Sequence, residues 1–401
     1  MRYRLHPTAD VPRFRARIAA VAAALLLLLL AIADAPARAA ISIPPNTWVK
    51  QPKPAQTVLP GYPGKFEARG WNHLLYNPLS KRMILYDGYL EASRPYSIYA
   101  NALWTYDPVA NRLYLESVSN WARIGNLTVP LPQNTTDPTP YDRHSYACIA
   151  FVPETNRLYL WGGANSSIRE SYLGDTWVYD FSLRKWRQVV TPVHPFNIFE
   201  QTMTHDPSAR RLVLYGGAPR AYEAGEQAWL FHLDTETWES VATPSTPSQR
   251  MSHSMTFDSY RCVSWMFGGG NYPDPGNELW SFDATARMWQ RVTPAGVVPA
   301  ARRFGSMAYD SRHDILMLWG GVVDDNRQYN DTWIFRPSTR QWQQLYPAVP
   351  PPLPVSNAED LAYDPENDVF VLHQGGEFWF FRYEPGGDGL PPKDVGDLRV
   401  R

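Results

Sequence analysis

The chain contains little cysteine and little excess charge. Its 401 residues include two cysteines, Cys148 and Cys262, so a small disulfide-stapled scaffold is excluded. The whole chain has a net charge of −1, and residues 40–401 carry 32 basic and 37 acidic side chains, a charge of −5. Because sequence-independent nucleic-acid binding needs a basic surface, no nucleic-acid partner is predicted.

The chain also lacks an apolar run long enough to span a membrane. The longest run, from Ile18 to Ala33, covers 16 residues, whereas about 20 are needed to cross the hydrocarbon core. It follows an arginine-bearing segment and precedes Ala37-Arg38-Ala39, a pattern typical of signal-peptidase sites. Residues 1–39 are predicted to be a signal peptide cleaved near Ala39, which leaves a secreted or periplasmic protein with no stable membrane insertion. An uncleaved anchor is the alternative.

Patterns of serine triads, phosphate-binding loops and zinc sites are not evident in the sequence. We therefore predict no cofactor and no metal site, and we assign no catalytic residue.

The sequence does contain a long internal repeat. Glycine pairs follow apolar runs at 162–163, 216–217, 268–269, 320–321 and 375–376, at separations of 54, 52, 52 and 55 residues. A tryptophan follows each pair after a variable loop, and in the first four units a second tryptophan comes nine residues later. Self-similarity at this period, in a chain with 14% aromatic residues, predicts an all-β repeat architecture with four strands per unit.

Two segments show this pattern most fully, WLFHLDTETWESV (229–241) and TWIFRPSTRQWQQL (332–345). They resemble the kelch-repeat family, of a secreted bacterial type, within the superfamily of the galactose oxidase central domain. The resemblance implies a β-propeller in which each repeat forms one blade. It implies little about activity, because kelch propellers include binding proteins, structural modules and enzymes.

Six blades are expected. A degenerate unit over 73–118 precedes the five glycine-pair units, and the last unit lacks a fourth strand that NTWVKQ (46–51) resembles. We therefore predict an all-β, six-bladed kelch-type β-propeller over residues 40–385, whose last blade is closed by the N-terminal strand. Residues 386–401 are predicted to form a flexible tail. The blades are expected to start near residues 69, 143, 199, 250, 302 and 358.

Function is expected on the face of the propeller that has the long connections. Strand direction alternates within a blade, so the loop before the first strand and the loop between the second and third strands share one face. These loops are long, whereas the turns at the other face are short. Arginine and tyrosine recur in the long loops and at the starts of the first strands. The predicted ligand-binding residues are Arg69, Arg94, Arg143, Arg169, Arg220, Arg250, Arg302, Arg327, Tyr96, Tyr172, Tyr222, Tyr272 and Tyr329.

The favoured hypothesis is an exported, non-catalytic, monomeric binding module. Arginine pairs bidentately with carboxylate or sulfate and tyrosine offers flat amphipathic contact, so the predicted ligand is a glycan or protein of anionic character. In the alternative interpretation, the arginines bind blade-to-blade carbonyls and turn aspartates and are structural.

A carbohydrate-active enzyme, either a hydrolase, a lyase or a sugar mutarotase, at the same propeller mouth is the alternative function. Acidic residues on that face include Glu200, Asp324-Asp325 and Glu359-Asp360, but no spacing selects a catalytic pair.

Overall fold

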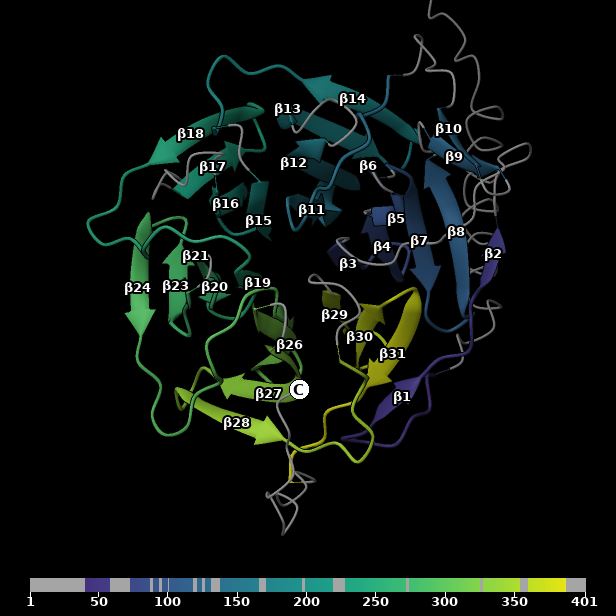
Figure 1. Cartoon of the computed structure of the whole chain (residues 1–401). Helices are drawn as coiled ribbons and strands as arrows, with labels where there is room; N and C mark the ends of the chain where they lie inside the picture. The colour runs from purple at the N-terminus through teal and green to yellow at the C-terminus, as the bar shows by residue number, and fades with distance from the viewer. Residues whose placement is uncertain are drawn as a thin grey trace, which may run out of the picture. The chain divides into compact units, whose positions relative to one another are not determined.

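The computed structural model shows a β-propeller of six blades and, among the residues it describes, no α-helix (Figure 1). The described residues are 40–57, 73–86, 89–93, 96–99, 101–117, 121–124, 127–130, 138–165, 171–196, 199–218, 228–271, 274–324, 327–353 and 360–386. The described part of the chain holds no helix long and apolar enough to cross a membrane. The expected all-β, six-bladed fold is confirmed.

Each blade is an antiparallel sheet whose strands run from the propeller axis outward in chain order. The first blade contains β3 (His73–Asn77), β4 (Arg82–Tyr86), β7 (Leu103–Asp107) and β8 (Arg112–Ser117). The second contains β11 (Ile149–Val152), β12 (Arg157–Asn165), β13 (Ser171–Asp180) and β14 (Lys185–Val189). The third contains β15 (Phe199–Asp206), β16 (Arg211–Ala218), β17 (Ala228–His232) and β18 (Thr237–Val241).

The remaining blades repeat this order. The fourth contains β19 (Ser254–Asp258), β20 (Val263–Phe267), β23 (Leu279–Asp283) and β24 (Met288–Val292). The fifth contains β25 (Ser306–Asp310), β26 (Ile315–Asp324), β27 (Arg327–Arg336) and β28 (Gln341–Leu345). The sixth contains β29 (Asp360–Asp364), β30 (Val369–Gln374), β31 (Glu377–Phe381) and the N-terminal strand β1 (Trp48–Lys50).

The N-terminal strand closes the sixth blade as predicted. β1 pairs antiparallel with β31, with Trp48 opposite Phe381, and the first and last coloured strands lie side by side in Figure 1. The indole nitrogen of Trp48 donates to Thr332 Oγ1 in the fifth blade at 3.0 Å, just as Trp238 of the third blade donates to Thr176 Oγ1 of the second at 2.9 Å. Trp48 therefore fills the fourth-strand tryptophan position of its blade.

The first blade and the connections contain strands that the repeat does not predict. β2 (Ala55–Thr57) pairs in parallel with β8 and adds a fifth strand to the first blade. Three hairpins lie in connections: β5 (Tyr89–Ser93) with β6 (Tyr96–Tyr99), β9 (Trp121–Ile124) with β10 (Leu127–Pro130), and β21 (Gly270–Asn271) with β22 (Asp274–Pro275). A 3₁₀ turn, η1 (Pro153–Thr155), joins β11 to β12.

The hydrophobic core lies between neighbouring blades. One cluster joins the second and third blades through Trp161, Phe231 and Trp238, and equivalent clusters join the other adjacent pairs from the first blade to the sixth. Since each interface buries aromatic rings from both blades, it contributes the burial energy that a single four-stranded sheet could not supply.

The glycine pairs of the third and fourth blades bond the next blade. The amide of Gly269 donates to the carbonyl of Arg302 in the following blade at 2.9 Å, and Gly217 makes the same bond to Arg250. A Cβ on Gly268 (φ +69°) would lie 2.6 Å from the Arg302 carbonyl oxygen. Only glycine permits this close approach of two backbones, which explains the glycine pairs at these positions.

Candidate functional site

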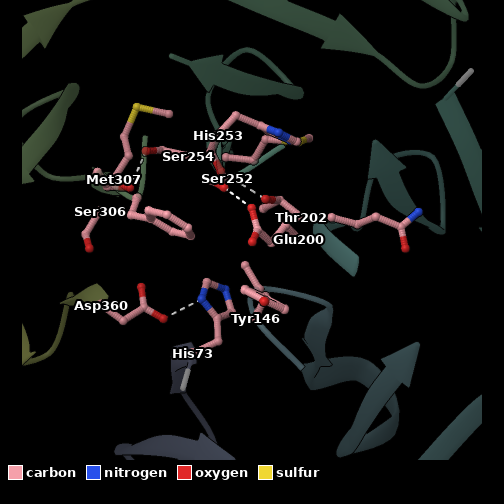
Figure 2. A pocket seen from close by; sticks show the side chains of 15 residues that line it. His73, Tyr146, Glu200, Thr202, Ser252, His253, Ser254, Ser306, Met307 and Asp360 are labelled. Carbon is pink, nitrogen blue, oxygen red and sulfur yellow. Dashed lines mark hydrogen bonds and ion pairs between the residues drawn. The ribbon is translucent and has the colours of Figure 1, made fainter. Parts of the chain in front are cut away.

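A cavity of about 60 Å³ opens on the propeller axis where the innermost strands begin. This is the face that has the connections between second and third strands, and Figure 2 shows the cavity from close by. All six blades contribute to its lining, which includes His73, Tyr146, Glu200, Ser252, Phe304 and Asp360 in blade order. We call this cavity the mouth pocket. Because each blade supplies part of its wall, the pocket exists only when the ring is closed.

Four of these residues have the same unusual backbone conformation. Each lies six residues before the last residue of its innermost strand and has a positive φ, which non-glycine residues rarely adopt. They are Tyr146 (φ 51°), Glu200 (φ 61°), Ser252 (φ 56°) and Phe304 (φ 56°). This conformation costs about 1 kcal/mol per residue. Strain of this kind persists where the surrounding structure fixes it, and it is concentrated at functional sites.

Hydrogen bonds between blades hold these positions. The amide of Ser252 donates to the Glu200 carbonyl at 3.2 Å, and the amide of Phe304 donates to the Ser252 carbonyl at 2.8 Å. Side chains two residues further on bond the next blade in the same way. Cys148 Sγ donates to the Gln201 carbonyl, Thr202 Oγ1 to the His253 carbonyl and Ser254 Oγ to the Gly305 carbonyl.

Glu200 is a buried carboxyl group without a paired cation. Its side chain accepts hydrogen bonds from the hydroxyl groups of Ser252 and Tyr146, and it forms no ion pair with any described residue. Burial raises the pKa of Glu200, and the hydrogen bonds together with the charge of Arg303 only partly oppose this effect.

The other carboxyl group of the pocket belongs to Asp360, at the start of β29. Asp360 Oδ2 accepts from His73 Nδ1 and from the amide of Leu74, and Oδ1 accepts from the amide of Leu361 at 2.9 Å. The contact through Nδ1 leaves His73 Nε2 as the ring atom available to a ligand. In Figure 2 the His73–Asp360 pair and Glu200 lie on different sides of the cavity.

His253 contributes no positive charge to the pocket. Burial, and to a lesser extent the charge of Arg250, lowers the pKa of His253 to about 3, so its ring is neutral at physiological pH. Neither ring nitrogen has a hydrogen-bond partner in the described part of the chain.

Three of the predicted ligand-binding arginines lie inside the blades rather than in the pocket. Arg143, Arg250 and Arg302 are at most 2% exposed, and each donates to the carbonyl of the first glycine of its blade's pair. Each also pairs with an acid two residues before the third-strand tryptophan. These arginine bridges join Arg143 to Asp175 at 2.5 Å, Arg250 to Glu278 at 2.5 Å and Arg302 to Asp331 at 2.6 Å.

The arginine bridges match the structural interpretation of these residues. Their carbonyl partners are in the same blade rather than in a neighbouring one, which corrects part of that interpretation. Their acids also do not come from turns: Asp175 and Asp331 lie on the third strands β13 and β27, and Glu278 directly precedes β23. The Arg302 guanidinium also lies over the Tyr329 ring, 4.3 Å from its centroid. Tyr329 therefore packs on an arginine bridge at the edge of the long-loop face.

The other predicted residues are dispersed or not described. Arg327 is exposed and pairs with Asp324 within one hairpin, and Tyr172 is half-buried on β13. Tyr96 lies on β6, but its side chain is outside the described structure. The predicted residues outside the described part of the chain are Arg69, Arg94, Arg169, Arg220, Tyr222 and Tyr272. No predicted ligand-binding residue lines the mouth pocket among those that are described.

One group of described residues has the spacing of a metal site. Ligand atoms of Asp310, His313 and Asp368 lie within 4.8 Å of one another near the short turns of the fifth and sixth blades. Asp310 already accepts from the amides of Arg312 and His313 and from His313 Nδ1 at 2.7 Å. These contacts account for the arrangement as turn stabilisation.

Comparison with known proteins identifies the repeat. The profile of the KLHDC2/KLHL20/DRC7 Kelch-repeats domain matches residues 147–372, more than half of the chain. Relatives include multiple epidermal growth factor-like domains protein 8 of Mus musculus, 28% identical over 54% of this chain and 8% of that protein. Acyl-CoA-binding domain-containing protein 5 of Arabidopsis thaliana is 25% identical over 55% of this chain and 33% of its own length.

A third relative is Kelch domain-containing protein 2 of Bos taurus, 28% identical over 29% of each chain. The three relatives come from eukaryotes, and the chain matches at most a third of the length of each of them.

Proposed function

The chain belongs to the KLHDC2/KLHL20/DRC7 Kelch-repeats domain family, whose propellers suggest protein interaction, and we propose that it binds a partner protein through its long-loop face. The observation that favours this face is the mouth pocket, a cavity built from all six blades whose lining includes the carboxyl groups of Glu200 and Asp360. A rigid ring that presents variable loops and one central pocket is suited to binding, because the scaffold pre-organises the contact surface.

The partner is not expected to be recognised through the arginine bridges. Arg143, Arg250 and Arg302 are already paired, so a carboxylate or sulfate ligand would have to displace Asp175, Glu278 or Asp331 from them. An anionic glycan or peptide would instead depend on predicted arginines outside the described structure. The described residues of the pocket favour a protein segment over an anionic glycan.

Photo-crosslinking tests which face binds. Two tyrosines form a matched pair for replacement by a photoreactive phenylalanine analogue: Tyr329 on the long-loop face, and Tyr260, 78% exposed, in the short turn between β19 and β20. With the full chain, we expect the partner to crosslink to position 329 and not to position 260. Crosslinking from position 260 alone would refute the proposal.

A carbohydrate-active enzyme at the same mouth is the second candidate. The His73–Asp360 pair with Glu200 across the cavity favours it, because an oriented imidazole and a carboxyl group of raised pKa are typical of acid–base catalysis. Turnover of a neutral or amino-containing oligosaccharide that Glu200→Gln abolishes would establish this function in place of binding.

Export of the chain is also proposed. It rests on the apolar run from Ile18 to Ala33 and the Ala37-Arg38-Ala39 pattern. N-terminal sequencing of the protein from the producing cell should give a chain that starts at Ala40; recovery of intact residues 1–39 would contradict cleavage.

A further inference from the structure

We propose that the mouth pocket binds a cationic side chain of the partner protein, the ammonium group of a lysine or the guanidinium group of an arginine. This inference rests on the proposed function and specifies the chemistry of recognition. Three independent features of the pocket lead to it: its charge, its remaining hydrogen-bonding capacity and its aromatic lining.

The first feature is charge. The pocket contains two carboxyl groups, Glu200 and Asp360, on different sides of the cavity, and its described lining contains no lysine or arginine. His253 is neutral, and His73 Nδ1 contacts Asp360 Oδ2. The buried cation whose charge acts on Glu200, Arg303, is not among the lining residues. A cation that enters the cavity would therefore meet carboxyl groups on two sides and no lysine or arginine in the described lining.

The second feature is hydrogen bonding. A hydroxyl group has one hydrogen to donate and two lone pairs. The hydroxyl hydrogens of Thr202, Ser252 and Ser254 are engaged by the His253 carbonyl, the Glu200 carboxylate and the Gly305 carbonyl. What these hydroxyl groups can still offer is lone pairs.

Several other polar atoms of the lining follow the same pattern, while the neutral ring of His253 keeps one N–H group. Tyr146 directs its hydroxyl hydrogen to Glu200, and the amides of Leu74, Ser252 and Phe304 donate to protein acceptors. With Nδ1 held by Asp360, His73 presents the lone pair of Nε2 in its neutral form. A site rich in acceptors selects a ligand rich in donors, and lysine and arginine are the side chains that carry donors only.

The third feature is aromatic surface. Tyr146 and Phe304 contribute to the lining, and both residues are partly exposed. A cation near the face of an aromatic ring is stabilised by its quadrupole, by an amount that grows as water is excluded. The Arg303 guanidinium already lies 5.8 Å from the centroid of the Phe304 ring, which shows that this ring accepts a cation. Both residues have a positive φ, and the amide of Phe304 donates to the Ser252 carbonyl of the preceding blade.

The size of the pocket fits the end of one side chain. A volume of about 60 Å³ holds several groups the size of a water molecule. A deeper cavity of about 220 Å³ continues from it along the axis and shares His73, Met255 and Met307 with it.

Blocked pentapeptides test the inference directly. The probes are Gly-Gly-X-Gly-Gly with X as lysine, arginine, norleucine or glutamate, and binding to the full chain is measured by NMR titration to about 10 mM peptide, a weak-affinity range. The lysine or arginine peptide is expected to bind at least tenfold more tightly than the norleucine and glutamate peptides. Equal binding of norleucine, or no binding of any probe, would overturn the inference.

Charge-neutral variants identify the site. Glu200→Gln and Asp360→Asn keep the shape of the side chain and remove a carboxyl group from different sides of the pocket. Each is expected to lower the affinity for the cationic peptide at least tenfold. The control is Glu377→Gln, which removes an exposed acid at the start of β31, outside the pocket. Unchanged affinity in both pocket variants, each with the wild-type melting temperature, would contradict the assignment.

Two further measurements separate this inference from the function on which it rests. If the partner crosslinks to position 329 while no cationic peptide binds, protein binding stands and the cation pocket is wrong. If glucosamine or a polyamine binds more tightly than the lysine peptide, the cation is not a protein side chain and the inference fails in that form.

Discussion

The arginine bridges and the mouth pocket both bury carboxyl groups, but their surroundings have opposite effects on them. In the second blade, burial raises the pKa of Asp175, and the charge and hydrogen bonds of Arg143 outweigh burial and lower it. Glu278 has a lowered pKa for the same reason, through Arg250. At the mouth, burial prevails and the pKa of Glu200 is raised. The bridge acids are thus compensated by a paired cation, whereas burial outweighs the opposing contacts of Glu200.

This difference distinguishes structural from functional burial of charge. A bridge connects the glycine pair, the third-strand region and the start of its blade, and it recurs in three blades. In the three other blades where the position of Glu200 is described, tyrosine, serine and phenylalanine occupy it. A buried acid of raised pKa in a strained conformation lowers stability, and such features cluster at functional sites.

Removing the cation of a bridge is expected to have the largest effect. Arg302→Met leaves Asp331 partly buried without its partner, and we expect a loss of about 3 kcal/mol in the free energy of unfolding. The matched control is Arg327→Met, which breaks an exposed pair with Asp324 on the same face and should cost less than about 1 kcal/mol. Urea unfolding measures both. Similar losses of unfolding free energy in the two variants would show that an arginine bridge contributes no more to stability than an exposed ion pair.

The pH dependence of stability should have opposite signs in the two regions. The folded-state pKa of Asp175 is lowered, so its stabilisation is present above its unfolded pKa and is lost as pH falls through the folded value. The folded-state pKa of Glu200 is raised, so its contribution is present below the unfolded pKa and is lost as pH rises through the folded value.

Unfolding measured from pH 3 to pH 8 tests this contrast. Groups that act on Glu200 include Tyr146, Ser252 and Arg303, with His73 and Asp360 across the cavity. Relative to wild type, Glu200→Gln should gain stability as pH rises, with a change within about 1 kcal/mol at pH 7. Asp175→Asn should lose stability as pH rises. The same sign in both variants would refute the contrast.

The sequence predicted the fold well because the fold depends on a repeated backbone requirement. Glycine pairs recur where Gly217 and Gly269 bond the next blade, and Trp48 matches the outer-strand tryptophans because it occupies their position. Such constraints restrict residue identity in every blade, so they are visible as a period.

The site was less accessible from the sequence. Arginine spacing located the strand starts but not the direction of each side chain, which the acid two residues before Trp177, Trp280 and Trp333 determines. The acid-x-Trp pattern is present in the sequence and could have predicted that these arginines are paired within their blades. The pocket residues Glu200 and Asp360 were recognisable only as acids on the correct face. Nothing in the sequence indicates that Glu200 adopts a positive φ, because that conformation depends on contacts between blades.

Substitution of Cys148 is expected to have the smallest effect, and it tests the hydrogen bonding on which the acceptor character of the mouth depends. Cys148 has the position in the second blade that Thr202 and Ser254 have in the third and fourth, and its thiol donates to the Gln201 carbonyl at 3.2 Å. Cys148→Ser preserves a donor and should change stability by less than about 0.5 kcal/mol. Cys148→Ala leaves a buried carbonyl without that donor and should cost about 1 kcal/mol more.

Cys262→Ala, in an exposed turn, is the control for loss of a thiol. If serine and alanine are equivalent at position 148, these side chains do not need their blade-to-blade bonds. Their hydrogens would then be available to a ligand, and the preference of the mouth pocket for a cation would rest on the charges of Glu200 and Asp360 and on its aromatic lining alone.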